Sequence, residues 1–170
     1  MACSFGQEAY SLAFVCQRLA ETNPTRWSTP EILATDISTQ ALKKAEQGLY
    51  NEADVSRGLS QSDLIRNFNQ VGTNWQVQPS IKKMVRFQRL NLLNDSFFSL
   101  NKFDLILCRN ILIYQSVANK SKIVGKLKGS LYSESVLLLG AGETLLGVSS
   151  DFDSAQLGET IAYRLRKSAG

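Results

Sequence analysis

The sequence contains no histidine. This absence excludes serine–histidine and cysteine–histidine catalysis and the common histidine metal sites, so any chemistry must proceed without the usual proton shuttle at neutral pH. No apolar run approaches the roughly 20 residues that cross a bilayer, and the N-terminus lacks the basic and apolar regions of a secretory signal. We therefore expect a cytoplasmic protein that is not inserted in a membrane.

Cysteine is also scarce. Cys3, Cys16 and Cys108 are an odd number of thiols, and their spacing suits neither a disulfide framework nor paired zinc ligands. We expect reduced thiols that pack as small hydrophobic residues, and no metal site.

The remaining composition is that of one globular domain, residues 1–170, with 44% hydrophobic and 20% charged residues. The net charge is only +4. Basic residues gather at residues 82–89, 120–128 and 164–167. Phe87 is the one aromatic residue within these ranges, so they lack the series of interleaved aromatic residues that stack on single-stranded nucleic acid. Acidic residues elsewhere dilute their field. We interpret these clusters as solvated faces and expect no nucleic-acid partner.

A glycine turn and a carboxylate form the most informative pair. The run from Cys3 to Ser11 opens a helix at Gly6, and the run from Ile32 to Ile37 carries Asp36 at the carboxyl end of a predicted strand. In doubly wound folds such a glycine permits close approach of a nucleoside cofactor, and the acid binds a ribose diol. Only three residues precede Ser4, so the strand that normally comes before the turn is expected to lie outside this chain or to have been lost.

Strands and helices are predicted to alternate in the first half. Helical spacing predicts a helix over residues 8–21 with one buried stripe. The stripe consists of Ala9, Leu12, Ala13, Cys16, Leu19 and Ala20. A strand over residues 31–35 follows, and then a short helix capped by Ser38 and ended by Gly48. Residues 49–58 show no clear hydrophobic periodicity, neither that of a helix nor that of a strand. A helix from Ser60 is expected to bury Leu64, Ile65 and Phe68, and residues 70–80 read as a polar connection.

The second half continues the alternation. Strands are predicted at residues 85–89, 103–108 and 135–139, the second of them covered on both faces. A helix from Ser116 should turn Ile123, Val124, Leu127 and Leu131 inward. Residues 152–167 read as an antiparallel hairpin, whose second arm alternates Ile161, Tyr163 and Leu165. The fold class is α/β, with helices on both faces of a Rossmann-like sheet. The terminal hairpin favours a class I methyltransferase over a dehydrogenase.

Five segments in this order carry a specific resemblance. The segments are Cys3–Ser11, Ala34–Ile37, Leu90–Leu93, Phe103–Tyr114 and Gly140–Glu143. They are similar to the S-adenosylmethionine-binding domain of the CheR family, the bacterial chemotaxis-receptor glutamate methyltransferases. The resemblance implies a protein-glutamate O-methyltransferase that uses S-adenosylmethionine as methyl donor and leaves S-adenosylhomocysteine. The acceptors it implies are glutamates in the cytoplasmic domain of methyl-accepting receptors.

The missing histidine fits this chemistry. A carboxylate with a pKa near 4.3 is already ionised at pH 7 and needs no base to attack a sulfonium methyl group. Positioning and exclusion of water can supply most of the acceleration.

The resemblance assigns Glu8 to the methionine end of the cofactor and Asp36 to both ribose hydroxyls. Glu8 read without the resemblance would only stabilise the helix dipole, and Asp36 would only cap a helix. Gly6 is expected to make the turn, with Tyr10 packed behind it.

The second half supplies the other implied site residues. Asn91 and Leu92 would frame the adenine, although Asn91 could equally satisfy a turn. Cys108 and Arg109 would lie beside the cofactor, where the guanidinium could hold a carboxylate or steer an acidic substrate. Tyr114 would orient the incoming glutamate, or else be a core aromatic with a satisfied hydroxyl. Asn110 is expected to shape the turn.

Two departures from the family are expected. The small helical domain that normally precedes the catalytic domain is absent from this sequence. Between Phe68 and Met84 there is also no glycine-rich insertion of the kind that grasps a receptor's C-terminal tether, so we expect activity independent of that tether. Two alternatives stay open: a degenerate module that binds cofactor or partner without turnover, and a class I methyltransferase with another acceptor.

Overall fold

The computed structural model describes residues 2–94 and 102–167. The chain folds as two compact units: an N-terminal unit, residues 3–89, and a C-terminal unit, residues 90–170 together with residues 1–2. Each unit has its own hydrophobic core, and each is described by itself. No helix within the described ranges is both long and apolar enough to span a bilayer.

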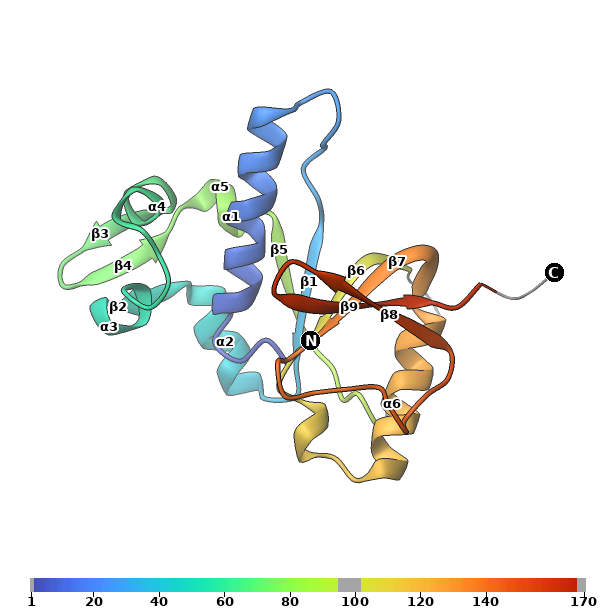
Figure 1. The fold of residues 1–170 in the computed structure, drawn as a ribbon. Helices are drawn as coiled ribbons and strands as arrows, with labels where there is room; N and C mark the ends of the chain where they lie inside the picture. Colours follow the sequence, from blue (N-terminus) through green and yellow to red (C-terminus); the bar gives the residue numbers. More distant parts are fainter. Residues whose placement is uncertain (1, 95–101, 168–170) are drawn as a thin grey trace. The chain divides into compact units, whose positions relative to one another are not determined.

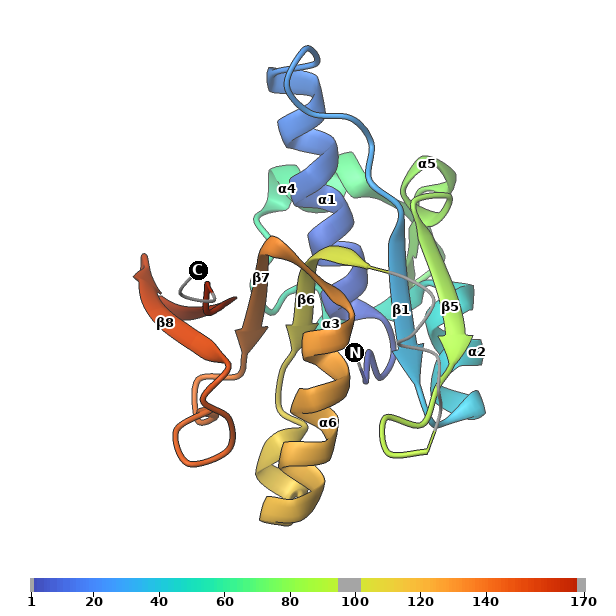
Figure 2. The same ribbon diagram turned by 90° about the vertical axis from the view of Figure 1, so that its right-hand side faces the viewer.

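The N-terminal unit is built around two parallel strands, β1 and β5, which lie side by side in Figure 2. Their register places Ile32 opposite Val85 and Asp36 opposite Arg89. The elements of this unit are α1 (Gln7–Thr22), β1 (Ile32–Asp36), α2 (Thr39–Gln47), β2 (Leu49–Asn51), α3 (Glu52–Val55), α4 (Gln61–Asn67), β3 (Phe68–Val71), β4 (Asn74–Val77), α5 (Pro79–Lys82) and β5 (Val85–Arg89).

The two helices that flank β1 form as predicted. Helix α1 buries Ala9, Tyr10 and Ala13, but Leu19, predicted in its buried stripe, is exposed. Helix α2 is capped by the Ser38 hydroxyl oxygen, which accepts a hydrogen bond from the Ala41 amide at 3.2 Å. It ends at Gly48, whose backbone is left-handed.

The prediction for residues 49–80 is wrong in part. The sequence predicts no regular element at residues 49–58 and a polar connection at residues 70–80. The structure has a three-stranded antiparallel sheet in this region instead, with the order β2-β4-β3. The hairpin of β3 and β4 is visible in Figure 1. Phe68 begins β3 instead of ending the helix, and Ile65 is exposed. Because only Phe68 and Val77 of this hairpin are buried, its strands carry no hydrophobic alternation that a sequence pattern could reveal.

The C-terminal unit contains one four-stranded sheet with the order β6-β7-β9-β8. Strands β6 and β7 are parallel (Figure 2), and β9 is antiparallel to both β7 and β8. The elements are β6 (Phe103–Cys108), the 3₁₀ helix η2 (Leu112–Tyr114), α6 (Val117–Gly129), β7 (Leu131–Leu139), β8 (Phe152–Leu157) and β9 (Thr160–Leu165). The predicted strands, helix and terminal hairpin are thus confirmed.

Three details of this unit differ from the prediction. Leu131 does not belong to the helix but begins β7. Ile161 is 47% exposed, whereas Tyr163, on the same face of β9, is buried. Strand β6 is not covered on both faces within its unit: Leu105 is 38% exposed, whereas the alternate residues Ile106 and Cys108 pack into the core.

Candidate functional site

The glycine turn of the N-terminal unit is fastened to the end of β1. The Cys3 amide donates to the Thr35 carbonyl oxygen at 2.8 Å, and the Gly6 amide donates to the Cys3 carbonyl oxygen at 2.8 Å. Gly6 has φ of 88° and Ser4 has φ of 51°. The turn is therefore a left-handed segment held against the strand that carries Asp36.

Asp36 connects this turn to the start of α2. One carboxylate oxygen, Oδ2, accepts a hydrogen bond from the Ser4 amide at 2.9 Å, and Oδ1 accepts one from the Ser38 amide at 2.9 Å. Each carboxylate oxygen has more than one acceptor position, so both keep the capacity to accept a further hydroxyl. The structure brings together the turn and the acid that the sequence paired.

The residues around the turn hold it from behind. Tyr10 is buried, and its hydroxyl donates to the Ala45 carbonyl oxygen at 2.9 Å. The Tyr50 hydroxyl donates to the Phe5 carbonyl oxygen at 2.6 Å. The structural roles predicted for Gly6 and Tyr10 are confirmed. Glu8 lies half-buried in the first turn of α1, and its contact with a cofactor stays a prediction.

In the C-terminal unit, Asn91 stabilises a turn, which is the alternative role predicted for this residue. Its side-chain oxygen accepts a hydrogen bond from the Leu93 amide at 3.0 Å. Lys126 fixes the same segment, because its ammonium group donates to the Leu92 and Leu93 carbonyl oxygens at 3.0 and 2.8 Å. The part of Asn91 and Leu92 in binding adenine stays a prediction.

The end of β6 carries three of the residues singled out from the sequence. Cys108 is fully buried in the core, and its place beside a cofactor stays a prediction. Arg109 is exposed. Asn110 adopts a left-handed backbone with φ of 57°, which confirms its role in shaping the turn.

Tyr114 closes the 3₁₀ helix η2 that follows this turn. Its side chain is 78% exposed, so the alternative reading as a core aromatic is excluded. An exposed phenol on a loop beyond a parallel strand is available to a substrate. Its contact with an acceptor glutamate stays a prediction.

Glu143 has a role in the site that the sequence does not predict. It lies in the segment Gly140–Glu143, which contributes to the family resemblance. It is 8% exposed, and its carboxylate accepts hydrogen bonds from five backbone amides. The donors are Gly140 at 2.7 Å, Asn110 at 2.7 Å, Ile111 at 2.8 Å, Leu112 at 2.6 Å and Ile113 at 3.2 Å.

These amides keep the carboxylate charged. Burial alone would raise the pKa of Glu143, but the hydrogen bonds from the backbone amides outweigh it, so the pKa lies below its ordinary value. A carboxyl group whose pKa is lowered by folding stabilises the protein at every pH above its unfolded-state pKa, and this contribution is lost as the pH falls through the folded-state value.

We therefore expect the free energy of unfolding to decrease steeply at acidic pH, and this decrease to depend on Glu143. Below about pH 4.3, the ordinary pKa of glutamate, the free energy of unfolding should fall more steeply for the wild type than for Glu143→Gln, which cannot titrate. Urea unfolding of both proteins between pH 7 and pH 3 measures the difference. If the free energy of unfolding fell equally steeply with pH in both proteins, this carboxylate would not have a lowered pKa.

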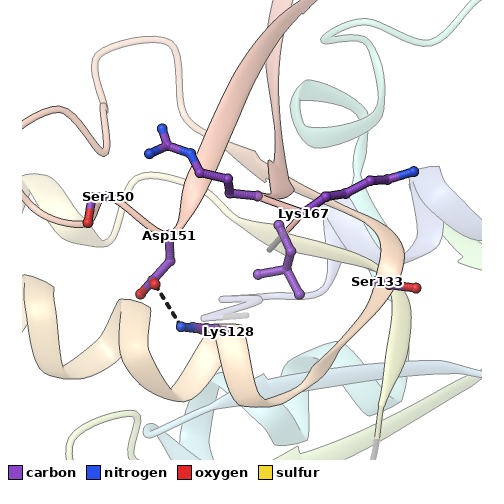
Figure 3. A pocket seen from close by; sticks show the side chains of 7 residues that line it. Lys128, Ser133, Ser150, Asp151 and Lys167 are labelled. Carbon is purple, nitrogen blue, oxygen red and sulfur yellow. Dashed lines mark hydrogen bonds and ion pairs between the residues drawn. The ribbon is translucent and has the colours of Figure 1, made fainter. Parts of the chain in front are cut away.

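A cavity of about 510 Å³ in the C-terminal unit has a different lining from the predicted site (Figure 3). Lys128 on α6 forms an ion pair with Asp151 at 2.7 Å, and the Arg166 guanidinium pairs with Asp153 at 2.9 Å. The side chains of Lys128 and Arg166 are exposed to solvent, and each forms an ion pair with an aspartate. This agrees with the interpretation of the basic clusters as solvated faces. The lining residues are Lys128, Ser133, Ser150, Asp151, Leu165, Arg166 and Lys167.

The cysteines and acids form no other centre in the described part of the chain. No disulfide joins Cys3, Cys16 and Cys108. Burial raises the pKa of the Cys3 thiol to about 11, so this thiol stays protonated at neutral pH. Within residues 2–94 and 102–167, no three side chains of metal-ligating type gather closely enough to hold a metal ion.

Comparison with known sequences identifies one family. The family model described as "CheR methyltransferase, SAM binding domain" matches residues 1–161. Chemotaxis protein methyltransferase 1 of Pseudomonas aeruginosa is 40% identical over 167 residues, which cover 97% of this chain and 61% of that protein. The protein of the same name in Vibrio cholerae is 36% identical over 166 residues, with coverage of 97% and 60%. The chain thus spans about three fifths of the length of these relatives.

Comparison with solved structures shows the fold. A TehB-like SAM-dependent methyltransferase from Corynebacterium glutamicum aligns with a TM-score of 0.52 and 12% identity, over 96% of this chain and 74% of that one. Magnesium protoporphyrin IX methyltransferase from Synechocystis, solved with bound SAM, aligns with a TM-score of 0.50 and 16% identity, over 96% and 65%. The predicted α/β methyltransferase fold is confirmed.

Proposed function

Because the chain belongs to the CheR methyltransferase family through its SAM-binding domain, we propose that it methylates glutamate side chains of chemotaxis receptors. The donor is S-adenosylmethionine, and the products are glutamyl methyl esters and S-adenosylhomocysteine. The acceptors lie in the cytoplasmic domain of the receptors, so the proposal includes a cytoplasmic location.

One observation in the N-terminal unit carries the cofactor part of this proposal. The Asp36 carboxylate is oriented by the Ser4 and Ser38 amides at the point where β1 ends and the glycine turn passes. A ribose diol offers two hydroxyl donors, and an oriented carboxylate can accept both. Glu8, in the first turn of the helix after this turn, would pair with the ammonium group of the methionine end.

The remaining site residues take roles that match their chemistry. Asn91 and Leu92 would contact the adenine, and Cys108 would lie beside the cofactor. The exposed guanidinium of Arg109 would attract a carboxylate, and the exposed hydroxyl of Tyr114 would donate a hydrogen bond to the acceptor glutamate.

The transfer itself requires no proton shuttle. A glutamate oxygen forms a bond to the methyl carbon while the bond from that carbon to the sulfonium sulfur breaks, and its electron pair remains on sulfur. No proton moves, and opposite charges are neutralised, so positioning and removal of water provide the acceleration. A protein without histidine can perform this step.

Two measurements on the same preparation test the proposal. S-adenosylhomocysteine is titrated into the protein by calorimetry, and base-labile incorporation of labelled methyl groups is followed in receptor-containing membranes. Binding together with incorporation supports the proposal. Binding without incorporation would favour the degenerate cofactor-binding module, and incorporation that resists base would favour another acceptor.

We also expect methylation to be independent of a receptor's C-terminal tether. Strands β3 and β4 are joined directly through Gly72 and Thr73, which leaves no insertion at this hairpin. Receptors with and without their last residues should be methylated at rates within about twofold, measured by initial incorporation at equal receptor concentration. A large loss of rate on truncation would contradict this expectation.

A further inference from the structure

Backbone amides in the C-terminal unit form an anion-binding site, and the carboxylate of Glu143 occupies it. The amides of Asn110 to Ile113, four consecutive residues, all point at one carboxylate, and the Gly140 amide completes the set. Successive amides that converge after a left-handed residue form a concave anion site, and Asn110 supplies that left-handed residue. Here the anion is the protein's own side chain.

Gly140 is adapted to this arrangement. A methyl group at Gly140 would lie 2.8 Å from Glu143 Oε2 and 3.0 Å from the Asn110 amide nitrogen. Both distances are shorter than ordinary van der Waals contact. Glycine therefore allows the carboxylate and the Asn110 turn to approach the end of β7 closely.

The carboxylate joins two segments that are far apart in sequence. Glu143 belongs to the connection from β7 to β8, as does Gly140, and its other four amide partners belong to the loop from β6 to α6. Leu112 and Leu145 enter the same core from these two segments. Tyr114 projects outward from the loop, and Arg109 is exposed at its start.

We propose that Glu143 is a positioning residue for methyl transfer: its carboxylate holds the loop of residues 109–114 in the geometry that presents Arg109 and Tyr114 to the acceptor. This inference rests on the proposed function. Without the anion, five backbone donors would lose their partner, and three of them, the amides of Gly140, Ile111 and Leu112, would do so in buried positions. Such donors recover hydrogen bonds only if the loop opens to water.

Glu143→Gln tests the proposal with little change in volume. A glutamine oxygen can still accept from one group of amides, but its NH₂ group then faces donors at the other position. We expect amide hydrogen exchange of residues 110–113 to accelerate at least about tenfold. We also expect kcat to fall at least about tenfold, with affinity for S-adenosylhomocysteine within about threefold of the wild type. Glu159→Gln, the same change in the exposed turn of the β8–β9 hairpin, should leave all three unchanged.

A second pair of variants keeps the test decisive if the glutamine variant folds poorly. Glu143→Asp retains the charge on a shorter side chain and should recover part of both the amide protection and kcat. Gly140→Ala retains the carboxylate but crowds it, and should accelerate exchange of the same four amides. Unchanged exchange in these variants would overturn the inference, as would faster exchange with an unchanged kcat. If the wild type binds cofactor but transfers no methyl group, the proposed function fails, and the exchange data alone decide whether Glu143 holds the loop.

Discussion

Replacing Asp36 with alanine is expected to weaken the binding of S-adenosylhomocysteine at least about a hundredfold. The side chain would lose two hydrogen bonds to the ribose, and each hydrogen bond to a charged group contributes about 1.5–3 kcal/mol. Since about 1.4 kcal/mol corresponds to a factor of ten in affinity, a hundredfold loss is the lower end of this range. Calorimetric titration of the variant and the wild type measures it directly.

Asp54→Ala provides the matched control for this change. Asp54 lies in the same unit and also accepts a hydrogen bond from a backbone amide, that of Asn51 at 3.4 Å. Its loss removes the same charge and a comparable contact, so affinity for the cofactor product should stay within about twofold.

The fold of the Asp36→Ala variant should survive. The two amides that its carboxylate engages are in exposed positions, so water can replace the lost acceptor. Circular dichroism and the urea midpoint should therefore stay close to the wild-type values. Unchanged cofactor affinity in a folded variant would reject the ribose assignment.

Elements with a clear period and a cap could be predicted from the sequence. Helix α2 is an example, since Ser38 and Gly48 mark its two ends, and so is the terminal hairpin of β8 and β9. The β3–β4 hairpin could not be predicted, because it lies largely at the surface and buries only Phe68 and Val77. Periodicity reports burial on one face, and a strand with few buried residues leaves little signal.

The residues of the candidate site also divide into those whose role could be predicted from the sequence and those whose role could not. The turn at Gly6 and the acid at Asp36 could be paired because one opens a helix and the other ends a strand, and both signals are local. Glu143 could not be assigned, because its partners are backbone amides and four of them lie 30 to 33 residues away. The available signal was an acid three residues beyond Gly140, directly after a buried strand.

Replacing Gly6 with alanine is expected to lower the free energy of unfolding by about 2–5 kcal/mol. A left-handed backbone costs a residue with a Cβ atom about 1–2 kcal/mol, and overpacking of a rigid neighbourhood costs typically about 1–3 kcal/mol. Both costs apply, since φ is 88° and the new methyl group would lie 2.9 Å from Ala45 Cβ and 3.3 Å from Phe87 Cζ. Ala45 belongs to α2 and is fully buried, so it cannot move aside without shifting the helix.

Gly58→Ala separates these two costs. Gly58 has nearly the same φ, 89°, but nothing lies within 4 Å of a methyl group placed there. Its replacement should therefore cost only the backbone term, about 1–2 kcal/mol, measured by urea unfolding beside Gly6→Ala. The difference between the variants reports the close approach of the turn to α2, and a displaced turn would also move the Ser4 amide away from Asp36 and weaken cofactor binding. Equal losses of stability in the two variants, with cofactor affinity preserved in both, would show that the turn does not need the contact with α2.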